Sequence, residues 1–204
     1  TPKTSSAASD VYKRQLKRQG FSWWCDRIRH ALTLYDAIRL DHFIGFYRYW
    51  SIAPRAKTAK GGHWEKALGG DLFRKIQQQH PQMPFVAEDL GKVVPEVRQL
   101  RDEFDLLGMK VLQLGFGSDR ESLTHLPHSY AASSIVYTGT HDFDTTAGWL
   151  RSQNPRSPAY KKMQGYLGKV DVAGLIRAAH HSVAHLSIVP LQDVLGLGSP
   201  HRMN

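Results

Sequence analysis

Carboxylates follow three apolar runs of the sequence. Asp41 comes directly after Ala37-Ile38-Arg39-Leu40, Glu88 after Pro84-Phe85-Val86-Ala87, and Asp142 after the run that ends in Gly139-Thr140-His141. Two carboxyl groups beside a glycosidic bond can perform retaining sugar chemistry, because one attacks the anomeric carbon while the other protonates the leaving oxygen and later deprotonates the acceptor. A third carboxylate can stabilise positive charge on the ring. The three residues are therefore candidates for such chemistry, if the fold brings them together.

Arg39 and Asp41 are spaced to meet. Side chains two residues apart on an extended strand point to the same side. A neighbouring cation favours the ionised form of a carboxylate, which is the form that a nucleophile needs. An ordinary salt bridge at the end of a strand is the alternative. The loop that follows is rich in rings that could stack on sugars or pack in the core, namely Phe43, Phe46, Tyr47, Tyr49, Trp50 and Trp64.

Other chemistries have weaker support. His141, Asp142 and Asp144 together with Glu88-Asp89 could hold a divalent cation, but only one histidine would be well placed. His181 and His185 could form a zinc-binding pair on one predicted helix face, although a solvated helix end is the simpler interpretation. A serine nucleophile motif is missing. Cys25, in a helical run, is expected to be a buried structural thiol.

Composition restricts the class of protein. The 204 residues carry a net charge of +9, yet the basic residues are scattered and no nucleic-acid motif is present, so we expect no nucleic-acid partner. No apolar run is long enough to span a membrane, and no signal peptide is visible. The single cysteine fits a reducing compartment. We therefore expect a cytoplasmic protein without a membrane partner; the sequence does not indicate the oligomeric state.

The first fifteen residues differ from the rest. Residues 1–15 are small, polar and without pattern, and residues 5–15 resemble the in-frame translation of a sequencing-library adapter. We predict that 1–15 is a non-native or disordered leader without function. Residues 16–204 then form the functional part of the chain.

Strand-like and helix-like segments alternate along residues 16–204. The sequence predicts strands at 37–40, 84–87, 108–114, 134–138 and 186–190, and helices at 20–35, 70–79, from 95, 145–150, 160–167 and 171–185, with a long irregular connection over 47–63. This alternation predicts an α/β fold with parallel strands, whose C-terminal ends gather the polar residues on one face. An open doubly wound sheet would do the same, but no glycine-rich phosphate loop favours it. We predict a partial (β/α)8 TIM-type barrel, containing about its last five strands with their helices.

Four ordered motifs resemble the 4-alpha-glucanotransferase family, also called amylomaltases or disproportionating enzymes. They are Arg39-Leu40-Asp41-His42-Phe43, Ala87-Glu88-Asp89-Leu90-Gly91, Gly108-Met109-Lys110-Val111-Leu112-Gln113 and Val136-Tyr137-Thr138-Gly139-Thr140-His141-Asp142. Pro190-Leu191-Gln192-Asp193 and the segments up to Asn204 are similar to the end of the family's barrel. The resemblance covers about 20–204. It implies a C-terminal fragment of the catalytic barrel.

The resemblance also implies roles for individual residues. Asp41 would be the nucleophile, Glu88 the general acid/base and Asp142 the stabiliser of the transition state. Substrate binding would involve Arg39, which also holds Asp41, together with His42 and His141. The family uses neither a metal nor an organic cofactor, and it transfers segments of α-1,4-glucans to the 4-hydroxyl of an acceptor glucan or glucose. A retaining α-glucan hydrolase of the same broad group, or an inert fragment, is the alternative.

Two features depart from the family pattern. Phe143 stands where the family usually has asparagine after His-Asp, which replaces an amide by an apolar ring. The chain also ends at Asn204, just before a family segment that lines the glucan groove. We therefore expect the isolated 204-residue chain to be inactive.

Overall fold

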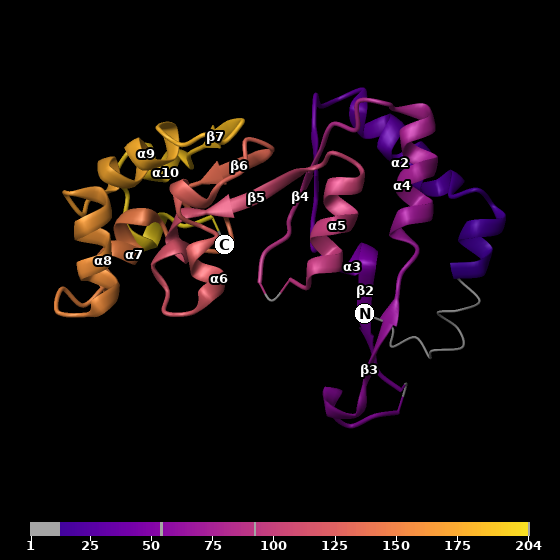
Figure 1. Cartoon of the computed structure of the whole chain (residues 1–204), viewed down its shortest axis with the longest axis horizontal. Helices are drawn as coiled ribbons and strands as arrows, with labels where there is room; N and C mark the ends of the chain where they lie inside the picture. Colours follow the sequence, from indigo (N-terminus) through magenta and orange to yellow (C-terminus); the bar gives the residue numbers. More distant parts are fainter. Residues whose placement is uncertain (1–12, 54, 92, 204) are drawn as a thin grey trace. The chain divides into compact units, whose positions relative to one another are not determined.

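The fold consists of two compact units. The computed structural model describes residues 13–53, 55–91 and 93–203, and the chain divides after Leu106 into a first unit and a second unit (Figure 1). In each unit, parallel strands alternate with helices. The predicted α/β class is therefore confirmed. Among the described residues, no helix is long and apolar enough to cross a membrane.

The first unit is built around one parallel pair of strands. Its elements are α2 (Ser22–Leu32), β1 (Ile38–Leu40), α3 (Ile44–Tyr47), β2 (Arg48–Ser51), η1 (Ala59–Gly61), β3 (His63–Lys66), α4 (Gly69–Gln79), β4 (Phe85–Ala87) and α5 (Pro95–Glu103). β1 pairs with β4 in a register that sets Ile38 opposite Phe85 and Leu40 opposite Ala87. Helices α4 and α5 each bury one apolar face against this unit's core, through residues such as Phe73, Ile76 and Val97.

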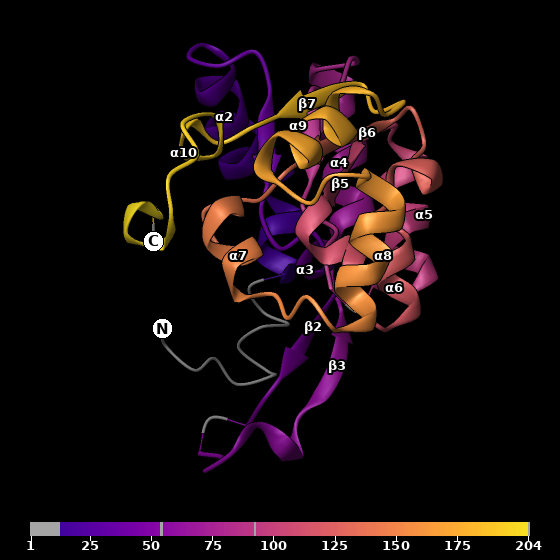
Figure 2. The same cartoon turned by 90° about the vertical axis from the view of Figure 1, so that its left-hand side faces the viewer.

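The predicted irregular connection over 47–63 is wrong in part. Residues of this stretch form β2, which pairs antiparallel with β3 and sets Trp50 opposite Trp64. Figures 1 and 2 show the hairpin extending away from the helices of the first unit. Gly61 and Gly62 belong to the loop between the two strands. The two strands have four residues each, and residues 52–62 join them in place of a short Asn-Gly or Asp-Gly turn, so the sequence carried no hairpin signal.

The second unit contains three parallel strands in the order β5, β6, β7. Its elements are β5 (Leu107–Val111), η2 (Leu112–Phe116), α6 (Arg120–Leu123), η3 (Pro127–Ser129), β6 (Ser134–Tyr137), α7 (Thr146–Ser152), α8 (Pro158–Leu167), α9 (Val172–His180), β7 (Leu186–Ile188), α10 (Leu191–Val194) and η4 (Ser199–His201). Val111 lies opposite Tyr137, and Tyr137 lies opposite Ile188. The C-terminal ends of these strands therefore share one edge.

Two predicted boundaries in the second unit need correction. The strand predicted over 108–114 ends at Val111, and the chain continues as the 3-10 helix η2. The helix predicted over 171–185 ends at His180. Beyond it, the Ser182 N–H bonds the Ala179 carbonyl oxygen, three residues back, and so does not continue the helical pattern of bonds four residues back. His181 and His185 therefore do not share a helix face.

The predicted leader is only partly within the described residues. Residues 1–12 lie outside them, whereas residues 13–18 are helical. Lys13 Nζ lies 3.0 Å from Glu65 Oε2 and 4.5 Å from the centre of the Tyr49 ring. That residues 1–15 are foreign to the protein stays a prediction.

Candidate active site

The register of β1 and β4 brings Asp41 and Glu88 to the same edge. Leu40 and Ala87 are paired, so the next residue on each strand leaves the sheet at its C-terminal end. Glu88 N–H donates to the Leu40 carbonyl oxygen at 3.0 Å, and Phe43 N–H donates to the Glu88 carbonyl oxygen at 2.9 Å. These backbone bonds fix the two carboxylates beside each other within the first unit.

Glu88 has the environment of an acid. Its Oε2 accepts a hydrogen bond of 2.7 Å from the backbone N–H of His42, a residue with a positive φ of 47° in the turn after β1. Burial raises the pKa of Glu88, and the Asp41 charge adds to the rise, whereas the His42 N–H and the Arg39 charge lower it. The net effect is a pKa above the ordinary value. A raised pKa is what a carboxyl group needs to hold a proton for a leaving group.

Asp41 is held by the predicted ion pair. Arg39 Nη2 lies 2.7 Å from Asp41 Oδ1, and the Asp41 side chain is 74% exposed. Asp41 and His42 border a cavity of about 530 Å³ within the first unit, whose lining includes the rings of Trp24, Phe46 and Tyr49. The candidate nucleophile therefore combines free access with aromatic surface nearby.

The aromatic residues divide into core and surface. Phe43 is fully buried and stacks on Phe73 at 5.7 Å between ring centres, so it belongs to the core. Trp50 and Trp64 are 40% and 48% exposed and meet edge to face at 5.3 Å on the hairpin. The rings therefore divide between the core, the surface of the hairpin and the lining of the cavity beside Asp41.

The third carboxylate lies on a loop of the second unit. His141 Nε2 is 3.4 Å from Asp142 Oδ1, and about half of each side chain is exposed. The Phe143 N–H donates to the Thr140 carbonyl oxygen at 3.0 Å, and this bond closes a turn around the pair. The structure thus brings His141 and Asp142 together, as it does Asp41, Glu88, Arg39 and His42 in the first unit.

Two buried carboxylates near these loops have structural partners that the sequence did not indicate. Asp89, next to Glu88, pairs with Arg101 Nη1 of α5 at 2.5 Å. Asp193, in α10, accepts hydrogen bonds from Thr138 and Thr146. Asp193 lies in a motif that resembles the family. Its hydrogen-bond partners are 47 and 55 positions away, so they could not be predicted from the local sequence pattern.

The metal alternatives gain no support from the geometry. Among the described residues, no group of three or more His, Cys, Asp or Glu side chains is arranged to hold a metal ion. Asp144 instead accepts bonds from the Ser199 hydroxyl at 2.7 Å and from the Thr145 N–H at 2.8 Å. Cys25 is buried, as expected for a structural thiol.

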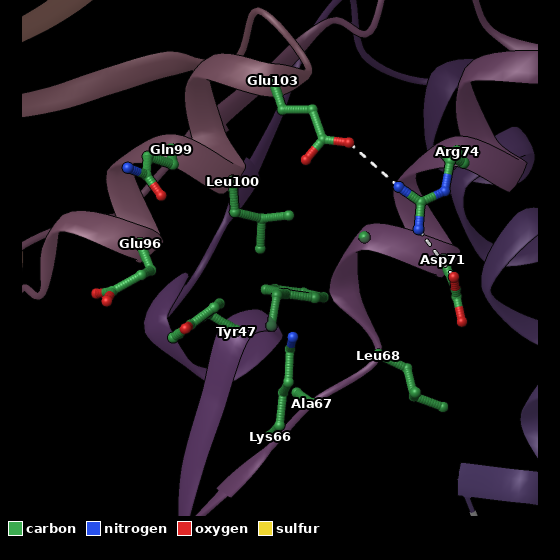
Figure 3. A pocket seen from close by; sticks show the side chains of 12 residues that line it. Tyr47, Lys66, Ala67, Leu68, Asp71, Arg74, Glu96, Gln99, Leu100 and Glu103 are labelled. Carbon is green, nitrogen blue, oxygen red and sulfur yellow. Dashed lines mark hydrogen bonds and ion pairs between the residues drawn. The ribbon is translucent and has the colours of Figure 1, made fainter.

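Another cavity, of about 610 Å³, contains none of the predicted site residues. Figure 3 shows Lys66 of β3 pointing into it, with Leu100 of α5 on the far side. Its charged groups are largely engaged with each other, since Arg74 pairs with Asp71 at 2.9 Å and with Glu103 at 3.1 Å. Bonds from Lys17 and Arg74 lower the pKa of Asp71, which is the opposite of what a proton-donating carboxyl group needs.

The comparisons with known proteins agree with one another. The family model described as 4-alpha-glucanotransferase matches residues 11–204. A 4-alpha-glucanotransferase of Thermus thermophilus is 46% identical over 200 residues, covering 93% of this chain and 39% of the relative. The chloroplastic/amyloplastic 4-alpha-glucanotransferase of Solanum tuberosum is 43% identical, covering 94% and 33%. The structure of a Streptococcus agalactiae amylomaltase in complex with acarbose has a TM-score of 0.86 and 30% identity, covering 94% of this chain and 39% of that one.

The fold and the paired carboxylates fit one class of protein. An α/β fold that sets a carboxyl group of raised pKa beside a second, arginine-bound carboxylate is typical of enzymes that act on glycosidic bonds. The chain belongs to the 4-alpha-glucanotransferase family. It spans about two fifths of the length of the first relatives.

Proposed function

We propose that this chain carries the catalytic carboxylates of an enzyme that transfers a segment of an α-1,4-glucan to the 4-hydroxyl of an acceptor glucan or glucose. The observation that carries the proposal is the pairing of Glu88, whose pKa is raised by burial, with Asp41, which Arg39 holds at 2.7 Å. This pairing supports a site in which Glu88 is the acid and Asp41 the nucleophile. Membership of the family supplies the substrate class.

The reaction is a double displacement with retention. An Asp41 oxygen attacks the anomeric carbon while Glu88 gives its proton to the leaving glycosidic oxygen, so that one C–O bond forms as another breaks. Glu88, now ionised, removes the proton from the acceptor 4-hydroxyl. The acceptor oxygen then attacks the anomeric carbon and releases the Asp41 carboxylate.

The remaining site residues serve binding and stabilisation. Asp142 stabilises the positive charge that develops on the sugar ring, and His141 contacts the sugar. Arg39 holds Asp41, and His42 contacts the substrate from the rim of the cavity that it shares with Asp41. This chemistry requires neither a metal nor an organic cofactor.

The architecture that completes the site is a (β/α)8 barrel of which this chain forms about the last five strands. The parallel strands of both units and their similarity to an amylomaltase support this proposal. A cytoplasmic location stays a prediction, since the names of the plant relatives place those proteins in plastids.

The experiment uses the complete product of the gene that encodes these residues, incubated with maltotriose. We expect glucose together with maltooligosaccharides longer than maltotriose, resolved by anion-exchange chromatography. The Asp41→Asn variant should lose this activity by at least about a thousandfold, because the nucleophile is removed. Asp26→Asn, on the exposed face of α2, is the matched control and should retain it.

Three outcomes would contradict the proposal. Glucose and maltose without longer products would indicate the hydrolase alternative, and no turnover at all would indicate an inert protein. Retained activity of Asp41→Asn would show that another group is the nucleophile. The isolated 204-residue chain, assayed in parallel, should show little or no turnover.

A further inference from the structure

Asp193 is a buried carboxylate with three hydrogen-bond donors. Its residue is 2% exposed. Oδ2 accepts from the Thr138 hydroxyl at 2.5 Å and from the Thr146 hydroxyl at 2.6 Å, and Oδ1 accepts from the Thr146 backbone N–H at 2.7 Å. Burial of a carboxylate costs free energy of solvation, and hydrogen-bond donors such as these three are needed to offset that cost.

The donors stand at the two ends of one loop. Thr138 directly follows β6, and Thr146 is the first residue of α7. The loop between them, residues 139–145, contains His141 and Asp142. Asp193 therefore ties the beginning of this loop to its end through a single side chain.

Gln113 gives the loop a second attachment. Its side-chain amide donates to the Asp144 carbonyl oxygen at 3.0 Å and to the Thr146 hydroxyl at 3.4 Å. Both Gln113 and Thr146 are buried. The His141–Asp142 pair itself is about half exposed, and the Asp142 N–H donates to the Thr140 hydroxyl of the same loop, so the position of the pair depends on how firmly the loop ends are held.

A carboxylate fits this place better than an amide would. Its two oxygens only accept, and all three donors are neutral groups. In asparagine, one oxygen could still accept from the Thr146 N–H, but the NH2 group would then face both hydroxyls. Those hydroxyls would then have to accept hydrogen bonds instead of donating them, which would weaken the attachment of the loop ends without changing the volume of the side chain.

We propose that Asp193 is a positioning residue that fixes the loop 139–145 and thereby sets the place of Asp142 and His141 in the reaction. The catalytic consequence of this inference rests on the proposed function, whereas the attachment of the two loop ends to Asp193 does not. Asp193 contacts no substrate and acts only through Thr138 and Thr146. The tie explains why a carboxylate is buried in a segment otherwise remote from the chemistry.

The test compares four variants of the complete gene product. Asp193→Asn alters the acceptor, and Thr146→Val removes the hydroxyl while it preserves the shape. Thr146→Ser keeps the hydroxyl but loses the buried methyl group. Asp171→Asn is the matched control, because Asp171 caps α9 in the same unit by accepting from the Gly174 N–H at 2.7 Å.

Two readouts are taken, hydrogen exchange of the backbone amides of residues 139–145 and the kinetics of transfer from maltotriose. In Asp193→Asn and Thr146→Val we expect faster exchange of this loop and a fall in kcat of about tenfold or more, with a smaller change in KM, because a misplaced stabilising group is felt chiefly in the transition state. Thr146→Ser and Asp171→Asn should retain loop protection and kcat.

Each contrary result has a distinct meaning. Unchanged hydrogen exchange of the loop in Asp193→Asn and Thr146→Val would show that Asp193 does not hold the loop ends in place. Faster exchange with an unchanged kcat would overturn the positioning role. An equal loss of kcat in Thr146→Ser would show that packing, not the hydrogen bond, matters. If the unmodified protein does not transfer glucan, the proposed function fails, while the exchange measurement still decides the tie.

Discussion

At the scale of single residues, neighbouring carboxylates acquire different properties from small differences in surroundings. Glu88 is half-buried and accepts a backbone N–H, whereas Asp41 is exposed and paired with Arg39. The sequence predicted the Arg39–Asp41 contact from the strand period of two. It could not predict the positive φ of His42 or the hydrogen bond from the His42 N–H to Glu88, because both depend on the turn after β1.

The first prediction concerns the pH dependence set by Arg39. The Arg39 charge lowers the pKa of Glu88, so Arg39→Gln should raise that pKa further. Glu88 must be protonated for the first step, and the alkaline limb of the kcat/KM profile should therefore move to higher pH. Arg39→Lys, which keeps the charge, is the control and should leave the limb in place. If the alkaline limb of the kcat/KM profile of Arg39→Gln were unchanged or moved to lower pH, the assignment of Glu88 as the acid would be contradicted.

At the scale of elements, the strands and helices that follow a clear period were predictable, and the hairpin was not. The β4 strand is buried at all three positions, and α4 repeats its apolar residues on one face, so both have a local signal. The hairpin depends on a charged residue instead. Glu65 accepts from the Tyr49 hydroxyl at 2.6 Å and from Lys13 Nζ at 3.0 Å.

The second prediction is an acid-sensitive hairpin. Bonds from Tyr49, Ser51 and Lys13 lower the pKa of Glu65 from 4.5 to about 2. Because the pKa of Glu65 is lower in the folded protein than in the unfolded chain, its ionised form stabilises the fold at pH values above 4.5. This stabilisation is lost as the pH falls from 4.5 toward 2. Fluorescence of Trp50 and Trp64 should report loosening of the hairpin over this window.

The Glu65→Gln variant provides the control for this titration. It removes the ionisable group, so the hairpin should be weaker at neutral pH and should lose the acid dependence specific to this window. Other carboxylates still titrate, and the comparison is therefore the difference between the two proteins. If the unmodified protein exceeded Glu65→Gln in stability by the same amount at neutral pH and near pH 2, the role of Glu65 would be contradicted.

The third prediction contrasts two glycines in helices. A Cβ at Gly69, at the start of α4, would overlap the backbone carbonyl of Phe46, whereas one at Gly165 in α8 would meet nothing within 4 Å. Gly69→Ala should therefore destabilise the fold by roughly 1–3 kcal/mol through overpacking. Gly165→Ala should stabilise it by about 0.5–1 kcal/mol, because alanine favours the helix. Urea unfolding monitored by circular dichroism measures both, and equal effects would contradict the close approach of α3 and α4.

At the scale of the whole molecule, the sequence motifs were more informative than the local patterns. Motifs around Asp41, Glu88 and Asp142 placed the chain in its family, which the family model over residues 11–204 confirms. The buried partners of Asp193 and Asp89 were not predictable, because a hydrogen bond between residues far apart in sequence exists only after folding. The chain spans 39% of its Thermus thermophilus relative, so the full barrel and its activity remain proposals.

In the proposed reaction Asp41 forms a covalent bond to the anomeric carbon of a glucosyl unit, and trapping this intermediate is the direct test of that role. In the complete gene product with Glu88→Gln, a maltosyl fluoride donor needs no acid to release fluoride, while the acceptor step lacks its base, so the ester should accumulate. Mass spectrometry of the digested protein should find a maltosyl group on the peptide that contains Asp41, and none in the variant that also carries Asp41→Asn. A maltosyl group on any other residue, or the same adduct in the double variant, would contradict the account.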